Sequence, residues 1–216
     1  DSETLAKREA EQRKDAEKHA AQAKAVWNEA LPIAGTLAEA YLRGRGITCQ
    51  LPKSLRFHPN CWHGLTAKRY PAMVAAVQGN QLAAVHRTYL KTDGSGKADI
   101  EPSKMMLGAT KRAAVRLSEC RKHLVVAEGI ETALSLSSGL LSAPAGVWAA
   151  LSTSGMRGLA LPPVAGHLTI ASDGEQAGRE AANALAARAN DLGWQVTLLP
   201  APDGLDWNDV LMMKGE

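Results

Sequence analysis

The stretch HLTIASDGEQAG, residues 167–178, places two carboxylates two residues apart, where an apolar run gives way to a glycine and an alanine-rich segment. Asp173 and Glu175 could simply belong to a turn, because Asp and Gly are common where a strand passes into a helix. Carboxylates this close together are also what a divalent cation needs as ligands. The other acidic residues of the chain bear on the choice between a turn and a metal site.

Further carboxylates follow other apolar runs in the same way. Glu128 ends the run HLVVAEG, and Asp206 and Asp209 lie in DWND, after the run WQVTLLPAP. In open parallel sheets the carboxyl ends of the strands share one edge, so these side chains should meet there and repel unless a cation lies between them. Oxygen-only ligands suit Mg²⁺ or Mn²⁺. We therefore predict a Mg²⁺ or Mn²⁺ site at Glu128, Asp173, Glu175, Asp206 and Asp209. Taken singly, Glu128 could be an acid in the first turn of a helix and Asp206 an N-cap.

The elements that must position these carboxylates alternate from His123 onward. Strands are expected at 123–129, 146–152, 167–173 and 194–202, and helices at 130–141 and 175–193. This alternation predicts an α/β fold with a largely parallel sheet and helices on both faces.

The preceding half of the chain has a different pattern. Residues 1–31 are rich in Ala, Glu, Lys, Arg and Gln, which predicts a solvated helix, and a short helix is expected at 37–43. Two apolar runs within 71–90 are separated by Gly79-Asn80 and predict a β-hairpin, and another strand is expected at 113–119. We divide the chain into an N-terminal helical segment (1–46), a basic α+β subdomain (47–120) and an α/β domain (121–216).

Charge is unevenly distributed along the chain. Residues 30–120 carry 13 Lys and Arg against 5 Asp and Glu, whereas residues 121–216 carry 6 against 10. A basic part beside an acidic part is typical of a protein that holds a polyanion and collects cations, although domains that bind no nucleic acid can differ as much. No apolar run approaches the ~18 residues of a membrane span and no signal peptide is indicated, so we expect a cytoplasmic protein without membrane contact. Cys49, Cys61 and Cys120 lack metal-binding spacing and are expected to be free thiols.

A family resemblance is carried by the segments VVAEGIETALS, TIASDGEQAGREAA and DWNDVL. In order and spacing they resemble the motifs of the Toprim domain, which primases, topoisomerases and some nucleases share. Over residues 121–212 the resemblance implies a Rossmann-like Toprim fold in which Glu128 is tied to catalysis and an Asp-x-Asp pair binds divalent metal. The second position of that pair is Glu175 here. The resemblance thus gives Glu128, Asp173 and Glu175 as catalytic residues, with a metal geometry altered by the longer Glu175 side chain.

A second resemblance extends upstream, to the segment that precedes Toprim in primase RNA-polymerase cores of phages and mobile elements. It rests on AEAYLRGRGI, LRFHP, RYPAMVAAVQ, LAAVHRTYL and PSKMMLGA. By position it implies that Arg56, Arg69, Arg87 and Lys104 hold the template and the incoming nucleotide, and their charged groups suit phosphate oxygens.

The two resemblances together imply a DNA primase core, a nucleotidyltransferase that makes short RNA primers. Its partners would be a single-stranded DNA template and ribonucleoside triphosphates, and a replicative helicase could join them. Two other functions stay open. One is a non-catalytic single-strand-binding module with a degenerate Toprim site, and the other is a Toprim nuclease.

Overall fold

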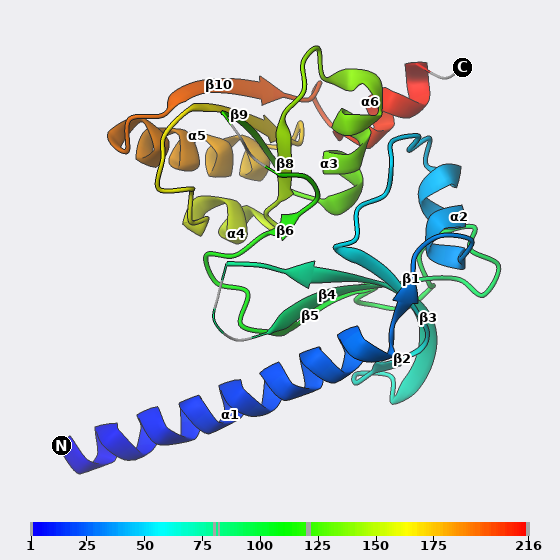
Figure 1. Ribbon diagram of the computed structural model, residues 1–216, viewed down its shortest axis with the longest axis vertical. Helices are drawn as coiled ribbons and strands as arrows, with labels where there is room; N and C mark the ends of the chain where they lie inside the picture. Colours follow the sequence, from blue (N-terminus) through cyan, green and yellow to red (C-terminus); the bar gives the residue numbers. More distant parts are fainter. Residues whose placement is uncertain (1, 80, 82, 120–121, 215–216) are drawn as a thin grey trace.

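The computed structural model, which describes residues 2–79, 81, 83–119 and 122–214, contains two five-stranded sheets and a long N-terminal helix (Figure 1). The first sheet has the order β1-β2-β3-β4-β5 and is antiparallel throughout. The second has the order β10-β9-β7-β8-β6 and is parallel except for β6, which runs antiparallel to β8. The predicted fold class, a largely parallel α/β unit preceded by a smaller α+β unit and an N-terminal helix, is confirmed.

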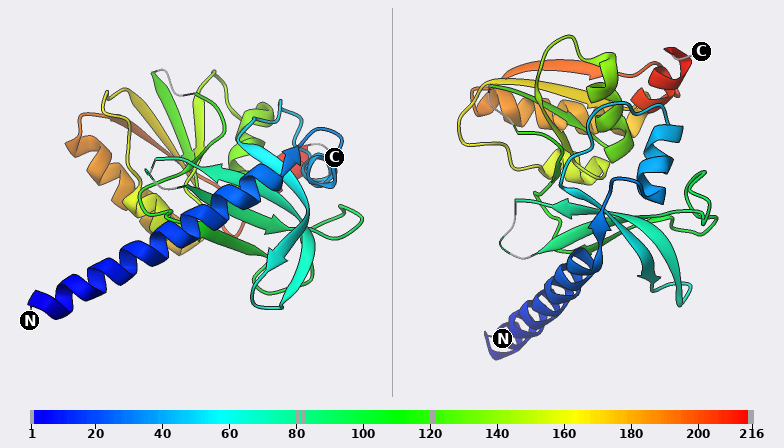
Figure 2. Two further views of the ribbon diagram at one scale, coloured as in Figure 1. Left: turned by 60° about the horizontal axis from the view of Figure 1, so that its bottom comes forward. Right: turned by 45° about the vertical axis from the view of Figure 1, so that its right-hand side comes forward.

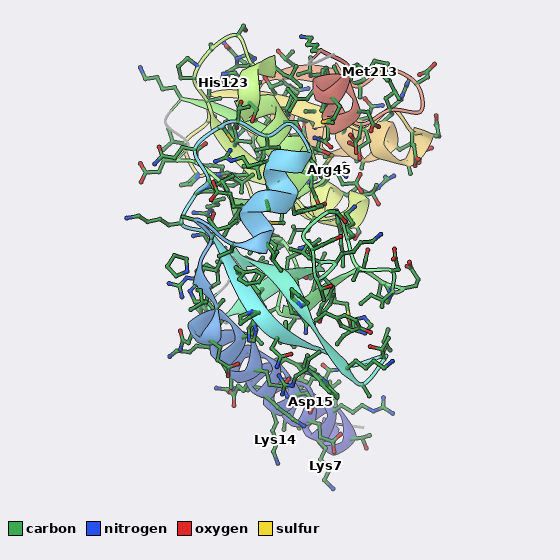
Figure 3. All side chains as sticks on the ribbon, turned by 90° about the vertical axis from the view of Figure 1, so that its right-hand side faces the viewer. Lys7, Lys14, Asp15, Arg45, His123 and Met213 are labelled. Atoms are coloured by element: carbon green, nitrogen blue, oxygen red, sulfur yellow. The ribbon has the colours of Figure 1, made fainter. Side chains whose placement is uncertain are left out.

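The first half of the chain begins with α1 (Ser2–Glu29), which is polar on most of its surface. The elements after it are β1 (Leu31–Pro32), α2 (Leu37–Gly44), β2 (Leu55–His63), β3 (Lys68–Val77), β4 (Ala84–Tyr89) and β5 (Lys104–Gly108). The C-terminal part of α1 packs on the sheet, where Ala23 of the helix and Ala30 just after it share a cluster with Val74 and Val85. The rest of the helix projects away from the molecule (Figure 2), and Lys7, Lys14 and Asp15 mark this part in Figure 3.

The second half of the chain alternates strands and helices as predicted. Its elements are β6 (Val115–Arg116), β7 (His123–Ala127), α3 (Ile130–Ser135), the π-helical turn η1 (Leu136–Leu140), β8 (Gly146–Ala149), α4 (Thr153–Gly158), β9 (His167–Ser172), α5 (Gln176–Asp191), β10 (Gln195–Pro200) and α6 (Trp207–Lys214). The strand expected at 113–119 is only two residues long. The strand expected at 146–152 ends early because Leu151 adopts a φ of 72° and the Ser152 hydroxyl caps α4, accepting the Gly155 N–H at 2.9 Å.

The two sheets share one core, and this sharing positions the site. Alternate residues of the second sheet, such as Leu124 and Val126, pack on α4 and α5, as expected for a strand covered on both faces. The residues between them, such as Val125, pack with α3 and with Leu55 and Met73 of the first sheet. The face of the first sheet opposite α1 therefore lies against the second half of the chain.

Three sequence predictions fall on residues outside the described ranges: the boundary between 120 and 121, Asn80 of the hairpin turn, and the thiol of Cys120. The strands on either side of that turn, β3 and β4, are antiparallel neighbours, as a hairpin requires. Cys49 and Cys61 are free thiols. None of the described helices combines the length and the hydropathy that crossing a membrane requires.

Candidate active site

Four carboxylates follow the carboxyl ends of strands in the second sheet, and we call them the acidic edge: Glu128, Asp173, Glu175 and Asp206. Glu128 follows β7, Asp173 and Glu175 follow β9, and Asp206 follows β10. These three strands are parallel, and β9 and β10 run toward α6 in Figure 1. The convergence expected from the strand order is therefore present.

Gly174 joins two of the loops that carry these carboxylates. Its N–H donates to the Leu205 carbonyl at 2.8 Å. A Cβ at Gly174 would lie 1.9 Å from the carbonyl oxygen of Pro202. The turn after β9 thus presses on the loop before Asp206 so closely that only glycine fits, and this contact places Asp206 near Asp173.

Asp173 is the most perturbed of the four carboxylates. Burial raises its pKa to about 7, and the negative charges of Glu128, Asp206 and Glu175 add to the effect. Its Oδ1 atom is buried and has no hydrogen-bond partner among the described residues. The pKa of Glu128 is also raised, first by burial and then by the charge of Glu175. These groups repel one another unless positive charge is placed among them.

The donor chemistry of the acidic edge fits a hard divalent cation, which prefers carboxylate oxygens. The buried, unpartnered Oδ1 of Asp173 is a free ligand position, and Glu128, Glu175 and Asp206 could supply further oxygens. As the side chains stand, no group of three or more His, Cys, Asp or Glu within the described part of the chain is arranged to hold a metal ion. The carboxylates are therefore near one another but not gathered around one point.

Asp206 and Asp209 form a reciprocal cap at the start of α6. Oδ1 of Asp206 accepts the N–H groups of Asn208 (2.7 Å) and Asp209 (2.8 Å), and Oδ2 of Asp209 accepts the Asp206 N–H at 2.9 Å. Asp206 is thus an N-cap, the alternative left open above, while its charge still acts on Asp173. Asp209, unlike Asp206, is not among the main charges that act on Asp173 or Glu128, so its predicted ligand role stays a prediction.

Glu175 stands at the N-cap position of α5, yet its side chain makes no capping hydrogen bond. Its charge instead raises the pKa of both Glu128 and Asp173. A purely helix-starting role therefore does not account for this side chain.

Lys104, at the start of β5, faces the acidic edge from the first sheet. Its Nζ donates to Oε2 of Glu131 at 3.0 Å, and its charge lowers the pKa of both Glu128 and Asp173. Glu131 is almost fully buried, and its Oε1 accepts the Tyr41 hydroxyl at 2.8 Å. Burial alone would raise the pKa of Glu131, but the charges of Lys104 and Lys97 outweigh it and hold that pKa well below the usual range.

Two more cations lie beside Lys104, and we call Arg45, Lys97 and Lys104 the basic rim. The pKa of Lys97 is lowered by burial and then by the charge of Lys104, with Arg45 adding to the effect. Arg45 follows α2 and lies where that helix meets the second half of the chain (Figure 3).

Sequence reasoning missed four members of this arrangement: Tyr41, Arg45, Lys97 and Glu131. The spacing of Glu131 from Glu128 indicated only an acid in a helix's first turn, and its burial depends on Tyr41, 90 residues away. Lys97 lies in KTDGSGKAD, residues 91–99, where the Gly, Ser and Asp content indicates only a flexible loop, so no local pattern identified it.

The three predicted arginines are held elsewhere. Arg56 and Arg87 lie on either side of Val74 in register, so they share the face of the first sheet that contacts α1, opposite Lys104. Arg56 stacks on Trp27 and donates to its carbonyl at 3.0 Å. Arg87 is buried and donates to two backbone carbonyls.

Arg69 lies at the far end of the β2–β3 hairpin, where it donates to the Asn60 carbonyl at 3.0 Å. Neither it nor the other two arginines are among the main charges that act on Glu128 or Asp173. Of the four predicted phosphate-binding residues, the structure brings Lys104 alone to the acidic edge.

Comparisons with known families agree with this architecture. Residues 123–216 match the family model described as "Toprim domain", and residues 17–117 match "Domain of unknown function (DUF7146)". The second half of the chain is therefore a Toprim domain. A search of curated proteins found no match.

Solved structures resemble both halves of the chain together. A DNA primase domain from Pseudomonas aeruginosa is 20% identical, with a TM-score of 0.52, over 92% of this chain and 75% of that one. The RNA polymerase domain of Mycobacterium tuberculosis primase DnaG is 17% identical, with a TM-score of 0.51, over 91% and 78%. The Aquifex aeolicus primase, with zinc-binding and RNA polymerase domains, is 14% identical, with a TM-score of 0.52, over 92% and 58%. The fold is that of the bacterial primase RNA polymerase domain.

Proposed function

We propose that this chain is a primase catalytic core, a nucleotidyltransferase that joins ribonucleotides into short primers on single-stranded DNA. The observation that carries the proposal is the acidic edge, where mutual repulsion and burial raise the pKa of Asp173 to about 7 and Lys104 stands opposite. The primase-type fold supports it. The narrower assignment to phage or mobile-element primases stays a prediction.

We assign the acidic edge to Mg²⁺ or Mn²⁺, which when bound would neutralise the carboxylates and polarise a triphosphate. The chain's own residues then have separate tasks. Lys104 presents an ammonium group to phosphate oxygens, and Glu131 fixes its position. Because Glu131 keeps a low pKa, it stays ionised and holds Lys104 throughout the neutral range. Arg45 and Lys97 add positive charge that would attract a triphosphate or a template phosphate.

The proposed division of labour follows the predicted segments. Residues 47–120 would hold the template and the ribonucleoside triphosphate, and residues 121–216 would hold the metal. Binding through phosphates would weaken steeply as salt rises. A replicative helicase would be a further partner. Arg69 remains a proposed template contact at the hairpin tip, while Arg56 and Arg87 would have to leave their carbonyl partners to reach a phosphate.

Primer synthesis from labelled ribonucleotides on a single-stranded template tests the proposal. Product should require Mg²⁺ or Mn²⁺ and should be lost in Asp173→Asn. Asp191→Asn, at the exposed end of α5, is the matched control and should retain full activity. Product without divalent cation, or equal product from both variants, would contradict the assignment.

A non-catalytic single-strand-binding module is the second candidate, favoured by Glu175 in the metal pair and by the carboxylates that are not gathered around one point. The same samples separate the two functions, because this module would bind the strand in a salt-dependent way and form no product with either cation. A nuclease would instead shorten the template.

A further inference from the structure

A cavity of about 820 Å³ lies at the β6 edge of the second sheet, away from the acidic edge. It is lined by residues before β2, after β3, around β6 and after α4, together with Trp148 of β8. Its volume is typical of sites for small ligands. None of its lining residues belongs to the acidic edge or the basic rim. A ligand in this cavity would therefore be separate from the candidate active site.

The wall of this cavity is positively charged. Lys53, Arg112 and Arg116 line it against one acid, Glu119, and all four side chains are exposed. Neither the lysine nor the two arginines form an ion pair with another described residue. Cationic side chains that line a cavity and have no ion-pair partner can bind an anionic ligand. Guanidinium groups suit phosphate in particular.

Two buried polar atoms of the lining residues lack partners. Trp148 is only 4% exposed, and its indole Nε1–H meets no acceptor among the described residues. The hydroxyl of Ser54 is likewise buried and unpartnered. Buried polar groups are nearly always hydrogen-bonded in folded proteins. Both atoms have almost no exposed surface, so a ligand would reach them only after the side chains that line the cavity shift on binding.

Arg116 adds a flat surface to the charge. Its guanidinium carbon lies 4.5 Å from the centre of the Trp148 ring, so the ring covers the guanidinium group from one side. Its exposed side can receive a nucleobase, because bases stack on arginine planes. The exposed side-chain amide of Gln78, which also lines the cavity, can donate to and accept from the edge of a base.

We propose that this cavity binds a nucleoside phosphate. The base stacks on Arg116, and Lys53 and Arg112 bind the phosphate, while the Trp148 indole beside Arg116 reports the binding. A free nucleotide and a segment of single-stranded nucleic acid offer the same chemistry.

The test follows the indole N–H signal of Trp148 by ¹⁵N NMR on the full chain in EDTA, with the signal assigned by Trp148→Phe. Without divalent cation, this measurement is independent of the proposed metal site. Adenosine monophosphate is titrated first, and a short oligodeoxyadenylate second. The signal should shift and saturate, and Arg112→Ala combined with Arg116→Ala should weaken binding about tenfold or more. Arg8→Ala, on the projecting part of α1, is the matched control and should leave the affinity unchanged.

The two titrations separate the sources of the ligand. Saturation by the monophosphate identifies a free nucleotide, whereas a response to the oligonucleotide alone identifies a strand. No shift with either probe overturns the proposal, and so does binding that the double variant leaves intact. An acidic peptide that moves the signal as strongly as the nucleotide would also overturn it, because the cavity would then select charge and not a base.

Discussion

Removing the charge of Asp173 should stabilise the metal-free protein near neutral pH while it removes the response to metal. Burial, and then Glu128, Asp206 and Glu175, raise the pKa of Asp173 from 3.8 to about 7 in the folded state. Below about pH 4 this group does not affect the free energy of unfolding. As the pH rises from about 4 to about 7 the free energy of unfolding falls, and above about pH 7 the full penalty applies. A shift of about 3 pKa units corresponds to about 4 kcal/mol. Solvent reaches part of the side chain and screens it, so we expect about 1–2 kcal/mol.

Urea unfolding in EDTA at about pH 8 and about pH 4 measures this effect. Asp173→Asn should be more stable than the wild type at the higher pH, and the difference should shrink toward zero at the lower one. Asp191→Asn should show neither change. An Asp173→Asn variant that is less stable at the higher pH would refute the electrostatic reasoning.

Metal provides the second half of the measurement. A cation that binds only the folded wild type at a hundred times its Kd should stabilise it by about 2.7 kcal/mol. In Asp173→Asn, Mn²⁺ should give much less. An equal Mn²⁺ response in both proteins would place the metal elsewhere.

Four other substitutions probe the residues in and around the site. Glu175→Gln should lower primer synthesis at an unchanged melting temperature, because the side chain makes no capping bond. Glu175→Asp should raise synthesis with Mg²⁺, because Mg²⁺ demands stricter geometry than Mn²⁺. If Glu175→Gln lowered the melting temperature and kept full activity, the side chain would have a helix-starting role instead. Asp209→Ala removes one hydrogen bond of the cap, so it should cost about 0.5–1.5 kcal/mol in urea unfolding and leave Mn²⁺ affinity unchanged. Weakened affinity would support the predicted ligand role. Glu131→Gln should cost about 1–3 kcal/mol, because it removes the charged acceptor from the Lys104 hydrogen bond. Unchanged stability would mean that the pair at 3.0 Å contributes nothing.

The parallel half of the fold could be predicted from the sequence because each strand there is short, apolar and followed by a helical segment. The antiparallel half was predicted less completely. β5 was not expected, since its residues are all partly or fully exposed and show no alternation. α4 was not expected either, because its single Ser cap acts only after the unusual backbone of Leu151 has ended β8.

The acidic edge could be predicted because the strand ends alone bring its carboxylates together. The sequence could not predict which residues of the first sheet face the site, as β4 shows. All of its residues from Ala84 to Tyr89 are buried, so the polar–apolar alternation that normally reveals the inward face is absent. The face of Arg87 is fixed by register with Val74, and the face of Lys104 by its pairing with Thr88. Both facts depend on tertiary structure.

The site belongs to the junction of the two sheets and not to the Toprim half alone. Glu131 is supplied by α3, but the side chains that keep it ionised while buried, Lys104, Lys97 and Tyr41, come from β5, the loop before it and α2. Without these side chains burial would raise the pKa of Glu131, because desolvation disfavours the charged carboxylate. Lys104 in turn lowers the pKa of Asp173 and Glu128, so it opposes the repulsion that the acidic edge creates. The first sheet therefore sets the charge state of the carboxylates that the second sheet positions.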